Sequence, residues 1–343
     1  MQSLNLRSGR FIGANKPTYI VAELNTSHFG NLDVACKMID AAKESGADCV
    51  KFQSWSESSL YSESFYQENP MAKRFMTKFS LNDQELKYLR DYTKQRNVDF
   101  ASTPYSIEEA KYLVEQCQVP FIKIASMDLN YLPFLEDIAH LDVPIFLSTG
   151  MGELREIRNA LETITACGNS RVVVMHCVSL YPTPDNLLNL NKILGLKNEF
   201  KDVMIGYSDH SLGSLASLAA VAMGCAVIEK HVTLDSKKIG FDNQMAMEFP
   251  EFQSMIQGIR RLEQMLGTYE RELSEAEVKK SLEMRRSVVA KKDIEQGEVI
   301  TIDKLDFKRP GNGIPLDQLS SVLGKTAKRN LPKDFMLAWT DLS

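Results

Sequence analysis

The sequence predicts an α/β protein, a closed (β/α)8 barrel followed by a small, mostly β domain. Short β-rich runs alternate with amphipathic helical patterns through eight units, which is typical of repeated βα units around a parallel sheet. Eight parallel strands can close around a core of their own side chains, so this number favours a barrel over an open sheet. The first predicted strand also lacks the G-x-G-x-x-G turn of a dinucleotide-binding fold.

The eight units follow one another along residues 19–266. Strands are predicted at 19–24, 49–52, 98–101, 121–124, 143–147, 172–176, 203–207 and 227–232. Helices are predicted at 32–45, 83–95, 107–116, 132–140, 153–166, 190–199, 212–223 and 250–266. The long polar segment 54–80 interrupts the second unit, at the position of a barrel loop that would face a substrate.

The pattern changes after the eighth unit. We therefore predict a catalytic barrel at 1–267, a charged, helix-favouring linker at 268–284 and a small domain at 285–343. Short strands of the small domain are separated by turns at 295–297 and 310–313. About 60 residues bury little surface, so this domain is expected to pack against the barrel or against a second subunit.

Composition excludes several classes of protein. A net charge of −5 gives no electrostatic footprint for nucleic acid or an anionic membrane. No apolar run approaches the ~20 residues of a membrane span, and the first 20 residues lack the apolar core of a secretory signal, which predicts a cytoplasmic protein. The cysteines form no C-x-x-C pair and are interpreted as reduced thiols. Cys177 follows His176 and is either a nucleophile or, as we favour, a packing residue.

Polar groups follow every predicted strand, where barrel enzymes place their catalytic residues. Lys51 and Lys123 lie within apolar strands, and a lysine inside a barrel is costly unless an anion compensates it. Four hydroxyl residues at strand ends would help these lysines to hold a phosphate and a carboxylate; they are Thr103, Ser126, Ser148 and Ser208. The alternative is a structural ion network in which the lysines pair with Glu23, Asp128 or Glu229.

Histidines form a second group. Four of the five lie at or just after strand ends; they are His28, His176, His210 and His231. His210 and His231 close neighbouring strands, so their rings could share a divalent ion such as Mn²⁺, with water and substrate oxygens completing the shell. A hydrogen-bonded core histidine is the competing interpretation. Glu23 ends the first strand and could orient water, relay a proton or simply pair with Lys51.

Short segments spread over nearly the whole chain carry a resemblance to a known family. They are IVAELNTSHFGN, GADCVKFQ, ASTPYS, FIKIAS, LSTGM, MHCVSLYPTP, GYSDHSLG, AVIEKH and, in the tail, KKDIEQGEVI and KRPGNG. Together they resemble the sialic acid synthases, which include legionaminic and pseudaminic acid synthases and a spore-coat polysaccharide relative. The tail resembles the antifreeze-like (SAF) module of that family.

The resemblance implies a metal-dependent transferase. Such an enzyme condenses phosphoenolpyruvate with an N-acylated hexose, either N-acetylmannosamine or a 2,4-diacetamido-trideoxyhexose, to give a nine-carbon 2-keto sugar acid and phosphate. It also implies Mn²⁺, or Mg²⁺ or Co²⁺, bound by His210 and His231, with Glu23 as the catalytic carboxylate. In the family the module crosses a domain-swapped homodimer, so that an arginine matching Arg309 reaches the other subunit's site.

The implied substrate residues fall into two sets. Phosphoenolpyruvate would be held by Lys51, Thr103, Lys123, Ser126, Ser148 and Ser208. The sugar would be faced by Gln53, Tyr181, Asp242 and Arg309, and Ser179 is a further substrate-binding residue.

Three stretches depart from the family pattern. Ser27-His28-Phe29-Gly30 replaces Asn-His-Asn-Gly, Ser179 replaces an asparagine, and Gly240-Phe241-Asp242-Asn243 replaces Gly-Pro-Asp-His. These changes cluster where the acyl and tail groups of the sugar should lie, so the chemistry of phosphoenolpyruvate is unaffected but the sugar is left open.

Two other functions stay open from the sequence alone. One is a Schiff-base aldolase with Lys123 or Lys51 as the nucleophile, which would need no metal. The other is a non-catalytic sugar or phosphate sensor, which would tolerate the loss of Glu23 without losing its ligand.

Overall fold

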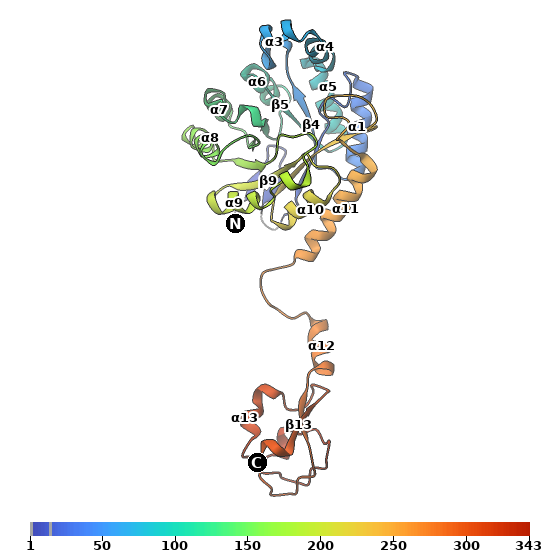
Figure 1. Ribbon diagram of the computed structural model, residues 1–343, viewed down its shortest axis with the longest axis vertical. Helices are drawn as coiled ribbons and strands as arrows, with labels where there is room; N and C mark the ends of the chain where they lie inside the picture. Colours follow the sequence, from blue (N-terminus) through green and yellow to red (C-terminus); the bar gives the residue numbers. More distant parts are fainter. Residues whose placement is uncertain (1–2, 14–15) are drawn as a thin grey trace. The chain divides into compact units, whose positions relative to one another are not determined.

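The computed structural model describes residues 3–13 and 16–343. The chain divides into two compact units, residues 1–267 and residues 268–343 (Figure 1). Each unit has a hydrophobic core of its own. Among the described residues, no helix combines the length and apolar character that crossing a membrane requires.

Eight parallel strands form the first unit. In chain order they are β3 (Tyr19–Glu23), β4 (Cys49–Ser54), β5 (Asp99–Pro104), β6 (Ile122–Ile124), β7 (Ile145–Ser148), β8 (Val172–His176), β9 (Met204–Asp209) and β10 (Val227–Thr233). Hydrogen-bonded neighbours run β5-β4-β3-β10-β9-β8-β7-β6, and β5 and β6 at the two ends of this path lie against each other. A two-residue strand, β11 (Met247–Glu248), pairs with β10. The predicted barrel is thereby confirmed, in a nearly closed form.

Helices surround the strands (Figure 1). They are α1 (Leu32–Ser45), α5 (Asp83–Gln95), α6 (Ile107–Glu115), α7 (Leu132–Ala139), α8 (Leu154–Ala166), α9 (Asn191–Glu199), α10 (Leu215–Ala222) and α11 (Phe249–Leu266). Helix α1 shows why these segments are helical. The side chain of Asn31 caps its first turn, Gly46 ends it with a left-handed φ of 93°, and the buried face includes Ala35, Met38 and Ala42.

Alternation along the strands creates two core layers. Residues such as Ile20 and Val50 point outward to the helices, whereas Val21 and Phe146 fill the barrel interior. An N-terminal hairpin that the sequence analysis did not predict, β1 (Ser3–Asn5) with β2 (Phe11–Gly13), adds Leu4, Leu6 and Ile12 to the interior cluster. The cluster includes Tyr19 and Val227, the first residues of β3 and β10, so the hairpin closes the amino end of the barrel and leaves the carboxyl end for a site.

The polar segment after β4 is helical. It forms α2 (Glu57–Leu60), α3 (Glu63–Glu68) and α4 (Pro70–Phe79), and Figure 1 shows α3 and α4 at one edge of the barrel unit. Trp55, Tyr66, Met76 and Phe79 bury a small core of their own. The insertion is therefore an ordered wall rather than an irregular loop.

The second unit is small and mostly irregular. It contains α12 (Glu275–Met284), the hairpin β12 (Ser287–Ala290) with β13 (Leu305–Lys308), and α13 (Leu319–Val322). Isolated bridges such as Ile294 with Leu331 hold the rest. The predicted turn at 295–297 uses Gly297 with a φ of 86°, in the left-handed region that favours glycine.

Short 3₁₀ turns complete the two units. They are η1 (Ser126–Asp128), η2 (Asp185–Leu187), η3 (Ile302–Lys304), η4 (Leu316–Gln318) and η5 (Trp339–Asp341).

Candidate active site at the mouth of the barrel

A cavity of about 390 Å³ opens at the carboxyl ends of the strands. The sequence-predicted residues that line it come from all eight strands and the loops after them. They are Glu23, Lys51, Gln53, Thr103, Lys123, Ser126, Ser148, Ser179, Tyr181, Ser208, His210, His231 and Asp242. The fold thus brings together in one hollow every predicted site residue that belongs to the first unit.

Period-two alternation explains which polar residues reach the cavity. Lys51 and Gln53 share one side of β4, and Glu229 and His231 share one side of β10; all four line the hollow. The residues between them face the helices instead. Lys230, for example, pairs with Asp209 at 3.0 Å behind the barrel wall.

Two lysines and two glutamates form the floor of the cavity. Lys51 forms an ion pair with Glu23 and donates a hydrogen bond to Thr103 Oγ1 at 2.9 Å. On the other side, Lys123 Nζ lies 3.1 Å from Glu229 Oε1. Both pairs are buried, so the ion network considered from the sequence is present, and it lies within the cavity rather than apart from it.

The two carboxyl groups differ in their affinity for protons. Burial raises the pKa of Glu23 to about 7; Lys51 opposes this effect and Glu229 adds to it. Burial also acts on Glu229, but Lys123 and Lys51 outweigh it and lower its pKa to about 2. Near neutral pH the cluster therefore gains or loses one proton, at Glu23. With Glu23 protonated, two ammonium groups face a single carboxylate, and the excess positive charge suits an anion.

Hydroxyls also line the cavity. Ser126 Oγ accepts a hydrogen bond from the Gly150 backbone N–H at 3.0 Å, and the Cys177 thiol lies 3.1 Å from the same oxygen. A Cβ added at Gly150 would lie 2.2 Å from Ser179 Oγ and 2.8 Å from Ser126 Oγ. Glycine at this position is what allows the two hydroxyls to converge.

The two histidines lie side by side in the same cavity. The ring centroids of His210 and His231 are 5.4 Å apart. His210 Nδ1 lies 2.7 Å from the Val178 carbonyl, which fixes this nitrogen as the donor and leaves Nε2 with a lone pair. Burial lowers the pKa of His210 to about 4 and the pKa of His231 well below its usual value, so both rings are neutral.

The donor set at this point fits a divalent metal. Neutral imidazoles are ligands, whereas protonated ones are not. The buried oxygen Glu229 Oε2 has no hydrogen-bond partner among the described residues. Two imidazoles, a nearby carboxylate and an open cavity resemble a catalytic site with free coordination positions more than a closed structural one.

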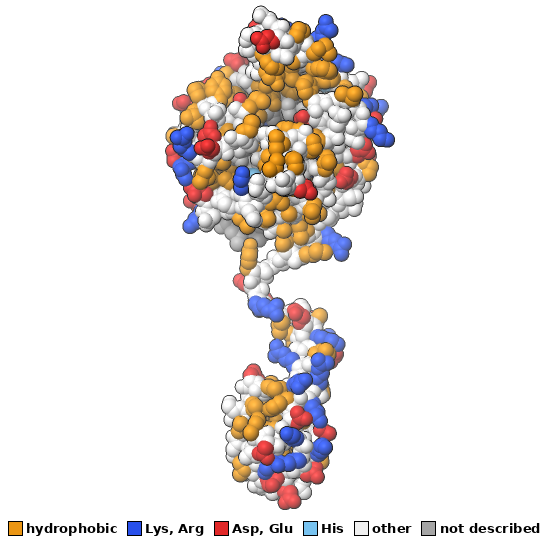
Figure 2. Space-filling view, viewed as in Figure 1, with side chains coloured by type: hydrophobic (Ala, Val, Ile, Leu, Met, Phe, Trp, Pro, Cys, Tyr) orange, Lys and Arg blue, Asp and Glu red, His pale blue; other side chains and the backbone are white. Residues whose placement is uncertain are grey.

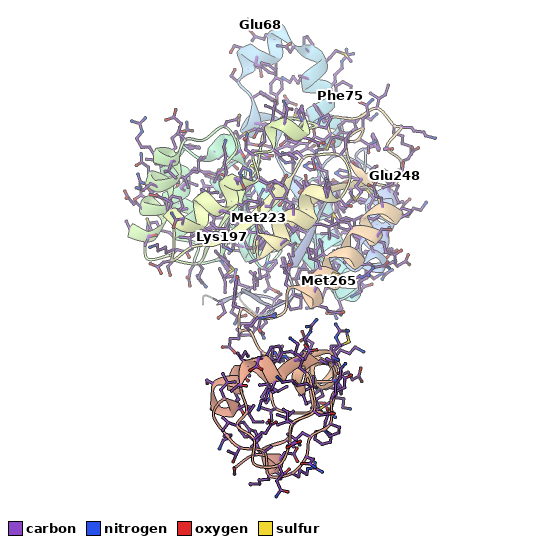
Figure 3. All side chains as sticks on the ribbon, turned by 60° about the horizontal axis from the view of Figure 1, so that its bottom comes forward. Glu68, Phe75, Lys197, Met223, Glu248 and Met265 are labelled. Atoms are coloured by element: carbon purple, nitrogen blue, oxygen red, sulfur yellow. The ribbon has the colours of Figure 1, made fainter. Side chains whose placement is uncertain are left out.

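Aromatic and apolar side chains form the upper wall. Tyr181 lies against His210 with ring centroids 4.2 Å apart. Phe241 packs edge-on against Phe75 and Phe79 of α4, at 5.8 and 6.0 Å, and Figure 3 labels Phe75 on this insertion. The same wall includes Trp55.

Asp242 follows Phe241 in the cavity wall and lies close to His231, one of the two candidate metal ligands. Its carboxylate accepts a hydrogen bond from Asn25 Nδ2 and lies 3.9 Å from His231 Nδ1. Burial raises the pKa of Asp242 to about 6, and the hydrogen bond from Asn25 opposes that rise.

Some strand-end residues lie outside the cavity. His28 is buried and its Nδ1 accepts a hydrogen bond from the Gly30 N–H. His176 contacts the Leu188 carbonyl at 3.0 Å and lines a separate cavity of about 840 Å³ beside Cys177. Arg309 belongs to the second unit, where its guanidinium contacts the sulfur of Met284 at 3.7 Å. Its role at the mouth stays a prediction.

The sequence analysis missed other lining residues. Asn25 and Tyr105 were given no role, Phe241 was placed near the sugar only as part of a stretch that departs from the family pattern, and Glu229 was considered as an ion partner. Tyr105 donates a hydrogen bond to Gln53 Oε1 at 3.1 Å. Strand alternation could have identified Asn25, Tyr105 and Glu229. Each lies two residues from a predicted site residue, namely Glu23, Thr103 and His231, and residues two apart on a strand face the same side.

Comparison with known proteins assigns the family. The NeuB family model matches residues 38–271, which is more than half of the chain. The chain belongs to the NeuB family of sialic acid synthases. An SAF domain model matches residues 285–343, so the second part of the predicted architecture is confirmed as well.

The similarity to named relatives covers nearly the whole chain. It is 38% identical to N,N'-diacetyllegionaminic acid synthase of Campylobacter jejuni, over 94% of this chain and 99% of the relative. It is 31% identical to human N-acetylneuraminate-9-phosphate synthase, over 96% of this chain and 94% of the relative. The crystal structure of N-acetylneuraminic acid synthetase from Leptospira borgpetersenii, in complex with citrate, is 32% identical, with a TM-score of 0.75 over 81% of this chain and 95% of that one.

Proposed function

We propose that this protein condenses phosphoenolpyruvate with an N-acylated hexose and water, giving a nine-carbon 2-keto sugar acid and phosphate. The observation that carries the proposal is one cavity lined both by two buried lysine–glutamate pairs and by two neutral histidines. The named relatives are synthases of sugar acids of this type.

Phosphoenolpyruvate would occupy the floor. Lys51 and Lys123 supply positive charge, and hydroxyls of Thr103, Ser148 and Ser208 supply hydrogen bonds. Both lysines are already fixed by glutamates, so their side chains are positioned before the anion arrives. A preorganised site loses less entropy on binding than one that must order two flexible lysines.

The reaction would begin with attack by C3 of phosphoenolpyruvate on the aldehyde carbon of the open-chain sugar, which forms the new C–C bond. The resulting cation at C2 is stabilised by nearby carboxylates and takes up water. The tetrahedral intermediate then loses phosphate by cleavage of the C2–O bond, and the C2 ketone remains. A divalent ion held by His210 and His231 would supply Lewis-acid polarisation of the sugar carbonyl.

Glu23 is the acid–base candidate. Its pKa of about 7 allows it to donate a proton to the alkoxide of the sugar or to accept one from the attacking water. Glu229, whose pKa is about 2, stays ionised and would hold the lysines throughout.

The ion pair of Lys51 with Glu23 disfavours Lys51 as the nucleophile of an aldolase. A Schiff base requires a neutral amine. Burial alone would lower the pKa of Lys51, but Glu229 and Glu23 outweigh it and raise the pKa above its ordinary value. The ammonium form thus dominates, which suits anion binding rather than nucleophilic attack.

The upper wall suggests which sugar is accepted. Phe241, Trp55 and Met76 are apolar, and the described lining residues include no basic side chain apart from the two floor lysines and the two histidines. Such a wall suits the methyl group of a 6-deoxy sugar better than a 6-hydroxyl group. It also places no basic side chain of the barrel where a phosphate at the end of the sugar would need one. We therefore favour a 2,4-diacetamido-trideoxyhexose over N-acetylmannosamine or a phosphorylated sugar.

A homodimer would complete the site. Large hydrophobic side chains are exposed on loops that follow the strands, including Met127, Met151, Leu180 and Leu212, and Figure 2 shows hydrophobic side chains grouped on the drawn face of the barrel unit. Apolar groups around a mouth are typical of a surface that another surface covers. We infer that the SAF unit of a second copy covers it and brings Arg309 to the sugar.

The proposal is tested by release of inorganic phosphate from phosphoenolpyruvate with Mn²⁺. Acceptors would be N-acetylmannosamine, its 6-phosphate and 2,4-diacetamido-trideoxyhexoses, each with and without chelator. We expect release that requires both a sugar and the metal, and that is fastest with the trideoxyhexoses. Absence of phosphate release with every sugar and metal would overturn the proposal. Phosphate release that chelator does not affect would show that the reaction needs no metal.

A further inference from the structure

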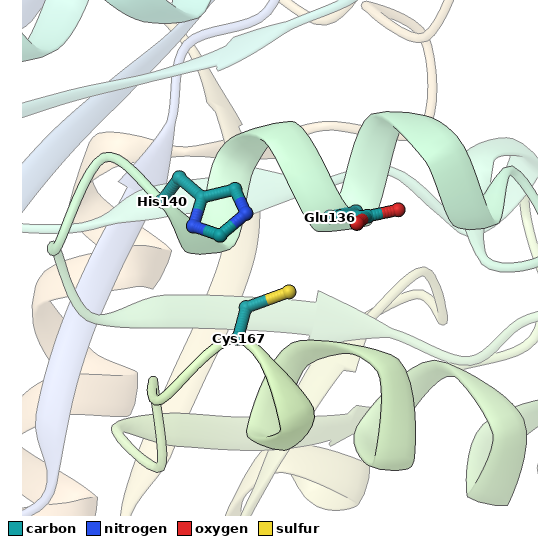
Figure 4. Close-up of side chains that lie close together, drawn as sticks. All are labelled: Glu136, His140 and Cys167. Atoms are coloured by element: carbon teal, nitrogen blue, oxygen red, sulfur yellow. The ribbon is translucent and has the colours of Figure 1, made fainter.

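A second group of metal-ligand side chains lies between α7 and α8. Glu136 and His140 are four residues apart and therefore project from the same side of the end of α7. Cys167 follows the last residue of α8, and its thiol points toward the other two side chains (Figure 4). One donor atom from each residue lies within 4.8 Å of the other two.

The backbone around this group also favours a cation. His140 is the C-cap of α7 and Cys167 is the C-cap of α8. The carboxyl end of a helix carries a partial negative charge, so two negative helix ends converge on the same three side chains. This observation is independent of which side chains are present, and it points to positive charge at the same place.

The chemistry of the donors narrows the kind of cation. An imidazole nitrogen, a thiolate and one carboxylate oxygen form a mixed N, S, O set that suits Zn²⁺ and disfavours Ca²⁺ or Mg²⁺, which prefer oxygen. Cys167 is half-buried and free, whereas Glu136 and His140 are exposed, so an ion can reach the group from solvent.

The group is separate from the barrel mouth. Helix α7 leads within a few residues into the start of β7, and α8 leads into the start of β8. The ends of these helices therefore lie at the amino ends of the strands, whereas His210 and His231 lie at the carboxyl ends. In barrel enzymes that amino face contributes to stability rather than to chemistry.

We propose that Glu136, His140 and Cys167 bind a divalent transition metal such as Zn²⁺, with water as the fourth ligand. Binding replaces the thiol proton of Cys167 with the metal and releases that proton to solvent. The ion ties the end of α7 to the end of α8, so it stabilises the barrel without entering its reaction. The inference does not depend on the proposed function.

Cobalt titration of the full chain tests the proposal. Co²⁺ replaces Zn²⁺ and gives a near-ultraviolet charge-transfer band only when a thiolate is a ligand. The titration uses the His210→Ala/His231→Ala double variant, which removes the candidate metal ligands of the mouth. We expect a thiolate band that saturates at one Co²⁺ per chain, is lost in Cys167→Ser, and requires at least about tenfold more cobalt in His140→Ala.

The matched control is Cys36→Ser, which removes the other half-buried free thiol and should leave the band unchanged. A second measurement is thermal unfolding of the same double variant, where Zn²⁺ should raise the midpoint and the further change Cys167→Ser should abolish that rise. Absence of a thiolate band in the double variant, or a band that survives Cys167→Ser, would overturn the proposal. Phosphate release by Cys167→Ser should match the parent, which separates this site from the proposed reaction.

Discussion

Replacement of Glu23 by glutamine removes one charge from the floor and keeps the shape of the side chain. Burial raises the pKa of Glu23 to about 7, so in the free protein its carboxyl group changes from mainly protonated to mainly ionised between pH 6 and pH 8. Phosphoenolpyruvate places further negative charge nearby. At about 6 Å and an effective dielectric constant of about 20, one such charge disfavours the ionised carboxylate by roughly 3 kcal/mol.

This repulsion should raise the pKa of Glu23 in the complex by about one to two units. The bound state then holds more protons than the free state, so affinity falls as pH rises through 7. A rise of one to two units weakens binding by about five- to tenfold between pH 6 and pH 8. Glutamine cannot titrate, so the Glu23→Gln variant lacks this contribution.

The assay is calorimetric titration with phosphoenolpyruvate at both pH values, in chelator, so that no bound metal alters the result. Buffers of different ionisation enthalpy report proton uptake directly. Ionisation of the phosphoenolpyruvate phosphate contributes equally to both proteins, so the comparison isolates Glu23. Equal pH dependence in parent and variant would refute the assignment. In the full reaction, with metal and sugar present, Glu23→Gln should lower kcat by about 10²- to 10⁴-fold.

Three further predictions follow from the site and its support. Arg309→Ala should depress turnover of the sugar by at least about tenfold, with unchanged phosphoenolpyruvate affinity and circular dichroism; full activity would contradict a shared site. Phe241→Ser should improve kcat/KM for N-acetylmannosamine relative to the trideoxyhexose, and an unchanged ratio would show that this wall does not select the sugar. Asp209→Ala removes the carboxylate beside the buried Lys230 ammonium, which keeps its hydrogen bond to the Ser211 carbonyl, and should cost about 3–5 kcal/mol in urea unfolding; a loss below about 1 kcal/mol would mean that the ion pair is dispensable.

Much of the barrel is predictable because its signal is local. Helices α1 and α5 begin and end as the sequence analysis placed them, since Asn31 and Asn82 cap them and their apolar faces repeat every three to four residues. The strands were found from apolar runs, but β4, β5 and β9 extend two or three residues further than predicted. The added residues include Gln53, Thr103 and Ser208, which are polar and line the cavity, so the apolar pattern ends before the strand does.

The remainder depends on contacts between distant residues. Each strand of the β1–β2 hairpin has only three residues, which is too short for a clear pattern. Its apolar residues Leu4 and Ile12 become buried only when the barrel interior is assembled. The polar segment after β4 becomes helical because a few aromatic residues, including Trp55 and Phe79, meet in a small core. Asp209 and Lys230 lie at strand ends but point outward, because neighbouring residues on a strand face opposite sides. Position at a strand end therefore does not by itself predict that a residue faces the cavity.

The most direct test of the central claim is the identity of the product. Phosphoenolpyruvate labelled with ¹³C at C3 is incubated with Mn²⁺ and a 2,4-diacetamido-trideoxyhexose, and the product is analysed by mass spectrometry and ¹³C NMR. The account predicts a nine-carbon 2-keto acid with the label next to the ketone, formed in a one-to-one ratio with inorganic phosphate. Release of phosphate with the label recovered as pyruvate, or no labelled sugar acid with any acceptor, would contradict it.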